Sequence, residues 1–362
     1  MRLIWADVLK ITAILGVILL HVSAPFLVPF EDSSAWWIGN VYDSFSRWCV
    51  PLFVMISGTL VLPSAGKIPL RTFLFVRVRR ILLPFLAWSV VYFLYRIHVK
   101  GEDLPLFGFF RMLLTETIFY HLWFVYMLIV LYLFAPAASV FLNRAPAKHV
   151  WYLIALWFLW ASLLPIIDRP FDFSIYYTPD MDDYAPLKLS GYFLLGYALR
   201  DRLAGSLWGT IGLLGVFVLG VAATVFGTYF MSRAAGQFHP FFYKYFSVTV
   251  VAMTVSLFLL VKSVCPAPRE IGNDGGERIR LNLPRALQVI GMSIYGVYLI
   301  HALVLELIRD GRLGFTIDPT CFLGWTLSPA MGIPVFASTV FVISIGCVMV
   351  LRGIAGVRDV LT

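Results

Sequence analysis

Lys10 and His21 are the residues whose types and spacing most directly predict chemistry. Both lie in the first apolar stretch, residues 5–28, which is long enough to cross a bilayer as a helix. Their spacing of eleven residues places them on one helix face, about 20° apart around the axis and ~16 Å apart along it. An ionisable side chain is costly among lipid tails, so inside a membrane helix it marks a functional site by default. The alternative is that Lys10 extends back to the membrane surface and that His21 only bonds a neighbouring helix.

Two more histidines are predicted to lie at the depth of His21. His121 opens a later apolar segment, and His301 lies past the middle of another. A histidine titrates near neutral pH, so it can take and return a proton during transfer to a hydroxyl. The sequence therefore predicts a proton-handling chamber toward one membrane face. The alternative for His121 and His301 is an interfacial or helix-bonding role.

A basic cluster is predicted at the opposite membrane face, on the same side as Lys10. Residues 71–80, which precede the third apolar segment, include Arg77 and Arg80 among their arginines. Guanidinium groups bind phosphate oxygens in pairs, and an ammonium binds them as a point charge. A ligand with phosphate groups could bind here, but anchoring to anionic lipid at ~1 kcal/mol per basic residue explains the cluster equally well. Asp7 is placed to pair with Lys10 one helical turn away.

The composition identifies a polytopic membrane protein. Of the 362 residues, 60% are hydrophobic and only 13% are charged, and a soluble domain of this size could not cover so much apolar surface. We predict an all-α fold of about ten transmembrane helices, in a single membrane-embedded domain over residues 1–362. The predicted spans are residues 5–28, 48–63, 81–98, 121–142, 150–167, 187–204, 207–230, 243–262, 286–308 and 329–351.

The distribution of charge predicts the orientation. With the N-terminus in the cytoplasm, most of the 28 lysines and arginines fall on the inner side and most of the 20 acidic residues fall on the outer side. Both termini are therefore predicted to be cytoplasmic. The same asymmetry explains the net charge of +8 as topology, not as binding to nucleic acid. The polar connector 265–284 is predicted to be an exposed loop.

No motif of a soluble enzyme occurs in the sequence, which leaves three classes of function. It has no GxSxG, Walker or HExxH pattern, and its four cysteines form no metal or redox motif, although a Cys49–Cys321 disulfide is possible. Ionisable residues within membrane helices fit an enzyme, and they also fit a secondary transporter or flippase for an envelope glycan or lipid. No internal repeat supports the transporter. A non-catalytic scaffold or sensor would leave the Lys10–His21 pair unexplained.

Several motifs together resemble the integral-membrane acyltransferase-3 family. Lys10 and His21 match its Arg/Lys-x10-His signature, VPLFVMISG at residues 50–58 resembles its second-span pattern, and RVRRILLP at residues 77–84 resembles its RxxR pattern. HLWF at residues 121–124 and SIYGVYLIH at residues 293–301 resemble later motifs. The likeness is greatest to the enterobacterial common antigen O-acetyltransferase type, which has no fused soluble domain. Lys10 departs from the arginine of many relatives, so the charge is kept but the guanidinium fork is lost.

This resemblance implies a membrane O-acyltransferase of the bacterial inner membrane. It would move an acyl group, usually acetyl, from cytoplasmic acyl-CoA to a hydroxyl of a cell-surface glycan or its lipid-linked precursor. His21 is expected to be catalytic, as a general base or a transient acyl carrier. Lys10, Arg77 and Arg80 are expected to bind the CoA phosphates. The expected acceptor site consists of His121, Trp123, Tyr298 and His301. The expected partners are acyl-CoA, the glycan or lipid-linked sugar and membrane lipids, with no metal, no permanently bound cofactor and no nucleic acid.

Overall fold

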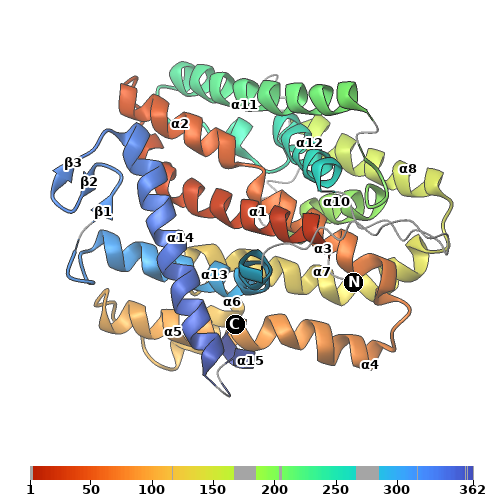
Figure 1. Cartoon of the computed structure of the whole chain (residues 1–362), viewed down its shortest axis with the longest axis horizontal. Helices are drawn as coiled ribbons and strands as arrows, with labels where there is room; N and C mark the ends of the chain where they lie inside the picture. The colour runs from red at the N-terminus through yellow and green to blue at the C-terminus, as the bar shows by residue number, and fades with distance from the viewer. Residues whose placement is uncertain are drawn as a thin grey trace.

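The chain folds into a bundle of helices. A computed structural model describes residues 3–115, 117–166, 185–203, 206–265, 285–315, 317–354, 356 and 358–361. Figure 1 shows most of the long helices side by side, with α14 crossing them. The elements are, in order, α1 (Ile4–Ser23), η1 (Ala24–Leu27), α2 (Ser34–Ser46), α3 (Cys49–Ala65), α4 (Leu70–Phe73), η2 (Leu74–Val78), α5 (Arg79–His98), α6 (Gly108–Thr115), η3 (Tyr120–Leu122), α7 (Trp123–Leu142), α8 (Ala147–Phe158), η4 (Leu159–Leu163), α10 (Ala185–Ala198), α11 (Leu207–Ala235), η6 (Phe241–Tyr243), α12 (Val248–Val264), α13 (Arg285–Arg309), β1 (Ile317–Asp318), β2 (Cys321–Phe322), β3 (Trp325–Thr326), α14 (Pro329–Gly353) and α15 (Arg358–Leu361).

Eight helices among the described residues are long and apolar enough to cross a membrane. They are Ile4–Leu27, Ser34–Ala65, Tyr120–Leu142, Ala147–Ile166, Leu207–Ala235, Phe241–Val264, Leu287–Arg309 and Pro329–Gly353. Two further helices, α5 and α10, occupy segments for which the sequence also predicted spans. The all-α polytopic membrane fold is therefore confirmed, whereas the count of ten spans and the cytoplasmic termini stay predictions. The short strands β1, β2 and β3 form a small antiparallel sheet that the sequence did not predict.

The second predicted span, residues 48–63, matches α3, but the sequence did not predict the helix that precedes it. In the structure the apolar helical region begins at Ser34, with α2 leading into α3. The Ser33 hydroxyl caps α2 by accepting a hydrogen bond from the Trp36 N–H at 3.2 Å. The sequence did not predict α2 because the polar residues Asn40 and Asp43 interrupt its apolar pattern. Both residues are nevertheless fully buried, since they bond other residues within the fold.

α1 lies in the middle of the bundle and carries both residues that the sequence singled out. It packs mainly against α13, α3, α14 and α2, and its Leu9, Ile14 and Ile18 are fully buried. In Figure 1 its N-terminal end points to the right, while the strands β1 to β3 lie at the left edge of the bundle. One unbroken helix therefore holds Lys10 and His21 about three turns apart on one face.

Glycines allow the backbones of α3 and α10 to pack closely against each other. A Cβ on Gly58 of α3 would lie 2.0 Å from the Phe193 carbonyl oxygen, and a Cβ on Gly196 of α10 would lie 2.0 Å from the Met55 carbonyl oxygen. Small residues let membrane helices approach until their backbones touch, because packing and hydrogen bonds hold helices together in lipid. The Thr59 hydroxyl donates to the Gly196 carbonyl oxygen at 2.7 Å and strengthens this contact.

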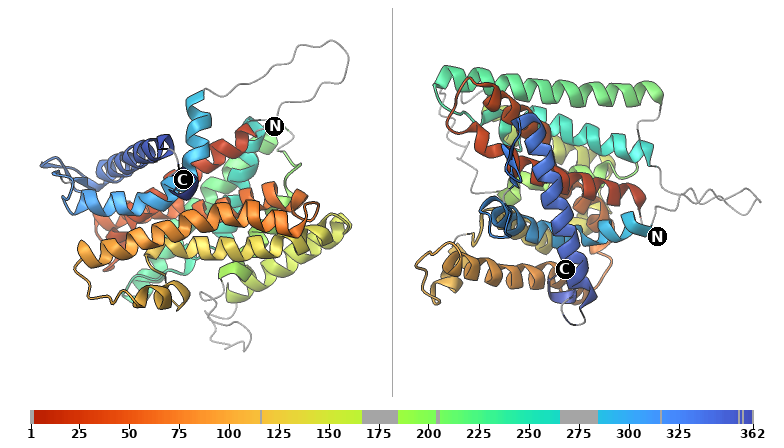
Figure 2. Two further views of the ribbon diagram at one scale, coloured as in Figure 1. Left: turned by 90° about the horizontal axis from the view of Figure 1, so that it is seen from below. Right: turned by 60° about the vertical axis from the view of Figure 1, so that its left-hand side comes forward.

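α11 forms one edge of the bundle. Figure 1 and Figure 2 show it lying along the outside, and its exposed side chains include Leu207, Trp208, Leu219 and Phe230. Exposed apolar side chains on a membrane-spanning helix face lipid, so this surface follows from the predicted class of protein.

The structure tests the predicted disulfide but not the predicted loop. All four cysteines are free, so the possible Cys49–Cys321 disulfide is not formed. Cys49 is fully buried at the start of α3, whereas Cys321 lies in β2. Residues 266–284, which make up nearly all of the predicted exposed loop, lie outside the described residues.

Candidate active site

Three histidines from separate segments meet near the C-terminal end of α1. The ring centroids of His21 and His301 are 5.6 Å apart with nearly parallel planes, and those of His121 and His301 are 5.1 Å apart with nearly perpendicular planes. His21 lies on α1, His121 on η3 and His301 on α13. We call these three residues the histidine cluster. In the described part of the chain, no group of three His, Cys, Asp or Glu side chains is arranged to hold a metal ion.

The hydrogen bond of His301 defines which of its nitrogens can react. Its Nδ1 lies 2.6 Å from the backbone oxygen of Tyr298. A carbonyl oxygen only accepts, so Nδ1 carries the hydrogen and neutral His301 has its free lone pair on Nε2. Within the described residues, this Nε2 and both ring nitrogens of His121 are buried without a hydrogen-bond partner. Unpaired buried polar atoms are rare in folded proteins, so these nitrogens are candidates to bind a ligand.

Tyr92 of α5 fixes the segment of α13 that carries His301. Its hydroxyl donates to the Leu299 carbonyl oxygen at 2.7 Å and accepts from the Leu303 N–H at 3.1 Å. Leu299 and Leu303 are separated by one helical turn and lie on either side of His301. The Tyr92 ring also contacts His121, with a centroid distance of 5.0 Å. One buried side chain therefore touches two segments of the histidine cluster.

The two predicted acceptor-site aromatics lie in different surroundings. Tyr298 belongs to the cluster, because its hydroxyl donates to the His121 carbonyl oxygen and its ring centroid is 5.6 Å from that of His301. Trp123 stacks instead on Tyr245, with a centroid distance of 5.9 Å. Among the described residues it makes no ring contact with the histidine cluster. The structure thus brings together four of the predicted residues and places Trp123 to one side.

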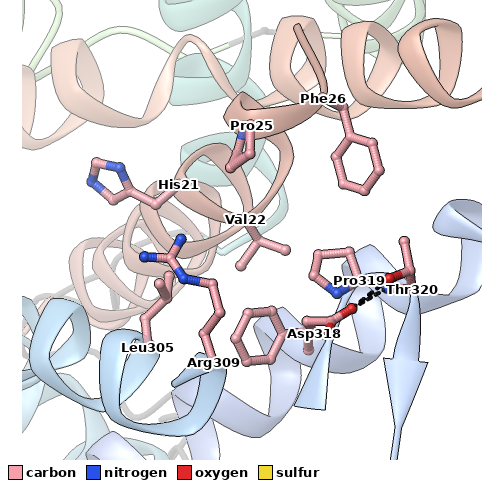
Figure 3. A pocket seen from close by; sticks show the side chains of 10 residues that line it. His21, Val22, Pro25, Phe26, Leu305, Arg309, Asp318, Pro319 and Thr320 are labelled. Atoms are coloured by element: carbon pink, nitrogen blue, oxygen red, sulfur yellow. Dashed lines mark hydrogen bonds between the residues drawn. The ribbon is translucent and has the colours of Figure 1, made fainter. Parts of the chain in front are cut away.

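A pocket of about 200 Å³ opens beside His21. Figure 3 shows the Arg309 side chain extending toward His21, with residues 318–320 forming another part of the wall. The remaining lining is mostly apolar. The lining residues are His21, Val22, Pro25, Phe26, Leu305, Arg309, Asp318, Pro319, Thr320 and Phe336.

Arg309 is held at this pocket by a network of ion pairs. The Glu306 carboxylate lies 2.5 Å from the Arg309 guanidinium and 2.7 Å from Lys100 Nζ, which lies 2.8 Å from the Asp310 carboxylate. Partial burial acts to lower the pKa of Lys100, but the hydrogen bonds to Asp310 and Glu306 outweigh it and raise that pKa above its usual value. Lys100 therefore stays charged, and Lys100 and Arg309 together balance the charges of Glu306 and Asp310.

A second arginine near the cluster, Arg47, is paired inside the fold. It bonds Asp43 one helical turn earlier, and the exposed fractions of the two side chains are 15% and 0%. Its guanidinium also lies 4.1 Å from the centroid of the Tyr243 ring. Arg47 therefore does not lie at the membrane surface as an anchor, because a buried carboxylate neutralises its guanidinium. The pair lies within electrostatic range of His21.

The three residues predicted to bind phosphate lie on separate elements. Lys10 Nζ is 3.6 Å from the Asp7 carboxylate, so the predicted pair is formed. Arg77, on η2, and Arg80, in the first turn of α5, are exposed. η2 packs against α5, α4 and α7, whereas α1 packs mainly against other helices. The phosphate-binding role of these three residues stays a prediction.

Sequence reasoning missed several residues of the site. The ring centroid of Tyr120 is 5.0 Å from that of His21, and its position next to His121 was a usable signal. Tyr92, Arg309 and Asp318 gave no such signal. Their places depend on how α5, α13 and the sheet pack together, which no local pattern reports.

Comparison with known proteins identifies the class of this site. A family model described as an acyltransferase domain matches residues 3–352, nearly the whole chain. The comparison with curated proteins found no match, and the comparison with solved structures found none either.

Proposed function

The chain belongs to the integral-membrane acyltransferase-3 family, and we propose that it moves an acyl group, usually acetyl, from acyl-CoA to a hydroxyl of a glycan. Family membership identifies a membrane acyltransferase. The acyl-CoA donor, the acetyl group and the glycan acceptor are the content of the proposal. The proposed acceptor is a cell-surface glycan or its lipid-linked precursor, as for the enterobacterial common antigen type. The proposed location is the bacterial inner membrane.

The observation that carries the proposal is the position of His21. Its imidazole contacts His301 on one side and lines an open pocket on the other. A residue that removes a proton from an acceptor must be reachable by that acceptor and held in one orientation. Tyr120 at 5.0 Å and His301 at 5.6 Å restrict the His21 ring, while the pocket leaves it accessible.

The chemistry assigned to His21 takes one of two forms. As a general base, it accepts the proton of the acceptor hydroxyl while the oxygen attacks the thioester carbonyl carbon. The carbon–sulfur bond then breaks, and the CoA thiolate leaves and takes up the proton. As a nucleophile, a neutral ring nitrogen of His21 attacks the thioester carbonyl carbon, the carbon–sulfur bond breaks and the CoA thiolate leaves. The acceptor oxygen then attacks the acyl carbon, the carbon–nitrogen bond breaks, and the proton of the acceptor hydroxyl ends on the CoA thiolate. A positioned base contributes about 10²–10⁴-fold in rate.

The remaining predicted residues are assigned to the two substrates. Lys10, Arg77 and Arg80 are proposed to bind the CoA phosphates at the cytoplasmic end of the bundle, because ammonium and guanidinium groups suit phosphate oxygens. His121, His301 and Tyr298 are proposed to surround the acyl group and the acceptor hydroxyl. Trp123 is proposed to contact the acceptor from its place beside Tyr245.

Transfer of labelled acetyl groups tests the proposal. The purified protein in liposomes receives radiolabelled acetyl-CoA and an envelope glycan extract, and label in the glycan is measured for wild type, His21→Ala and His98→Ala. His98 is an exposed histidine outside the cluster, so it is the matched control. We expect transfer by wild type and His98→Ala, and a loss of at least about 10²-fold in His21→Ala.

Two results would contradict the proposal in different ways. Equal transfer by wild type and His21→Ala would remove His21 from the chemistry while leaving an acyltransferase. If wild type neither transfers label nor binds acetyl-CoA, yet moves labelled glycan across the liposome membrane, the function is transport.

A further inference from the structure

The pocket beside His21 has the size and chemistry of a site for one sugar ring. Its volume of about 200 Å³ is below the ~300–1,000 Å³ of pockets that enclose drug-sized ligands, so it does not enclose CoA or an oligosaccharide. Its wall includes the aromatic residues Phe26 and Phe336 together with ionised and hydroxyl side chains. A small ring with apolar faces and polar edges fits such a wall.

The wall formed by residues 318–320 accepts hydrogen bonds. Oδ1 of Asp318 accepts from the backbone N–H and the hydroxyl of Thr320, both at 2.7 Å. An ionised carboxylate has about four acceptor positions, so these two bonds orient Asp318 and leave acceptor positions for a ligand. Because the Thr320 hydroxyl already donates to Asp318, it too offers only lone pairs to the pocket. Both side chains therefore select for O–H or N–H donors.

This wall is rigid because its backbone is packed directly on α14. A Cβ on Gly332 would lie 1.8 Å from the carbonyl oxygen of Pro319, so only glycine allows the turn to lie this close. Ile317, the residue before Asp318, is buried, and the Leu327 N–H donates to the Thr320 carbonyl oxygen at 2.8 Å. A binding wall on such a support is positioned before the ligand arrives.

Arg309 supplies hydrogen-bond donors to the pocket. One of its guanidinium nitrogens bonds Glu306, and a guanidinium has five N–H groups, so several remain for a ligand. Figure 3 shows this side chain extending toward His21. Glu306 already balances the positive charge of Arg309, whereas no cation in the described network balances the negative charge of Asp318. A ligand with a carboxylate would therefore be repelled by Asp318 and would find no unpaired cation in the described part of the pocket wall.

We infer that the pocket binds one uncharged sugar ring of the acceptor, held by Asp318, Thr320 and Arg309 with its hydroxyl directed to His21. This inference rests on the proposed function, because it places the acceptor of that reaction. It adds a preference for neutral over anionic sugars, and it makes the β1–β2 turn the element that determines specificity.

Ligand-detected NMR on the full chain in nanodiscs tests this inference without requiring catalysis. The probes are methyl β-glucopyranoside, the methyl glycoside of N-acetylglucosamine and methyl β-glucuronide, each followed by saturation transfer from the protein. Asp318→Asn is the main variant, because an amide oxygen keeps the bonds to Thr320 and hence the turn. Phe26→Ala tests the pocket from a different element. Asp103→Asn, an exposed acid outside the pocket, is the control.

We expect at least one of the two neutral glycosides to bind and methyl β-glucuronide to give no signal at the same concentration. Binding should weaken about tenfold in Asp318→Asn, as for a lost bond to a charged group, and should be unchanged in Asp103→Asn. The inference is overturned if methyl β-glucuronide binds at least as tightly as the neutral glycosides. It is also overturned if Asp318→Asn and Phe26→Ala both bind the neutral glycosides with the affinity of the wild type. Acetyl transfer to the same glycosides is measured in parallel. Binding without transfer keeps the inference and counts against the proposed function.

Discussion

Tyr92→Phe removes one hydroxyl and tests whether α5 positions His301. The wild-type hydroxyl is fully buried and lies between the Leu299 carbonyl oxygen and the Leu303 N–H of α13. Without it, these two groups either bond each other or stay apart. If they bond each other, the turn of α13 around His301 shifts, and a displacement near 1 Å costs about 10²-fold in rate.

The cost in stability follows from the same geometry. If the two backbone groups stay apart, each buried unpaired group costs about 1–3 kcal/mol. If they close the helix, the loss is about 0.5–1.5 kcal/mol for one net hydrogen bond. We therefore expect the free energy of unfolding to fall by about 0.5–1.5 kcal/mol if the two groups bond each other, and by about 2–6 kcal/mol if both stay unpaired. The ring stays against His121, so the variant changes hydrogen bonding and not packing volume.

The assay separates positioning from general damage. Acetyl transfer is measured as kcat and KM for both substrates in wild type, Tyr92→Phe and Tyr295→Phe. The Tyr295 hydroxyl donates to the Ile81 carbonyl oxygen at 2.7 Å and links α13 to α5 away from His301, so it is a matched control. We expect a fall in kcat of about 10–10²-fold for Tyr92→Phe alone, with KM for acetyl-CoA nearly unchanged. Equal kcat in the two variants would refute the positioning role of Tyr92.

Two further predictions address the donor site and the helix packing. Lys10→Ala should raise KM for acetyl-CoA and leave KM for the acceptor unchanged, because an ammonium that binds the donor's phosphates acts on the donor alone. Steady-state kinetics with each substrate varied in turn check this. A rise in KM for the acceptor instead of acetyl-CoA would contradict the assignment. Gly196→Ala should lower the free energy of unfolding by about 1–3 kcal/mol, because the new Cβ would lie 2.0 Å from the Met55 carbonyl oxygen. Gly346→Ala is its control, since a Cβ there meets no atom within 4 Å. Thermal unfolding in detergent compares the two, and equal midpoints would mean that α3 and α10 are free to separate.

The class of the protein and the common face of Lys10 and His21 follow from the sequence by itself. Hydrophobic length decides whether a segment can cross a membrane, and helix geometry decides which residues share a face, so neither depends on the rest of the fold. The Asp7–Lys10 pair was predictable for the same reason, because a spacing of three residues on a helix brings two side chains together. The family motifs, too, are short patterns within single segments.

Only the tertiary structure decided which segments meet. The rings of His21, His121 and His301 touch because α1, η3 and α13 pack together, and a common depth in three helices does not determine their rotation or their order around the bundle. The burial of Arg47 depends on Asp43, with which it forms an ion pair inside the fold. Asp318 reaches the pocket because a glycine of α14 lets the β1–β2 turn approach. These contacts join residues far apart in the chain, and their energies come from packing, which local periodicity does not encode.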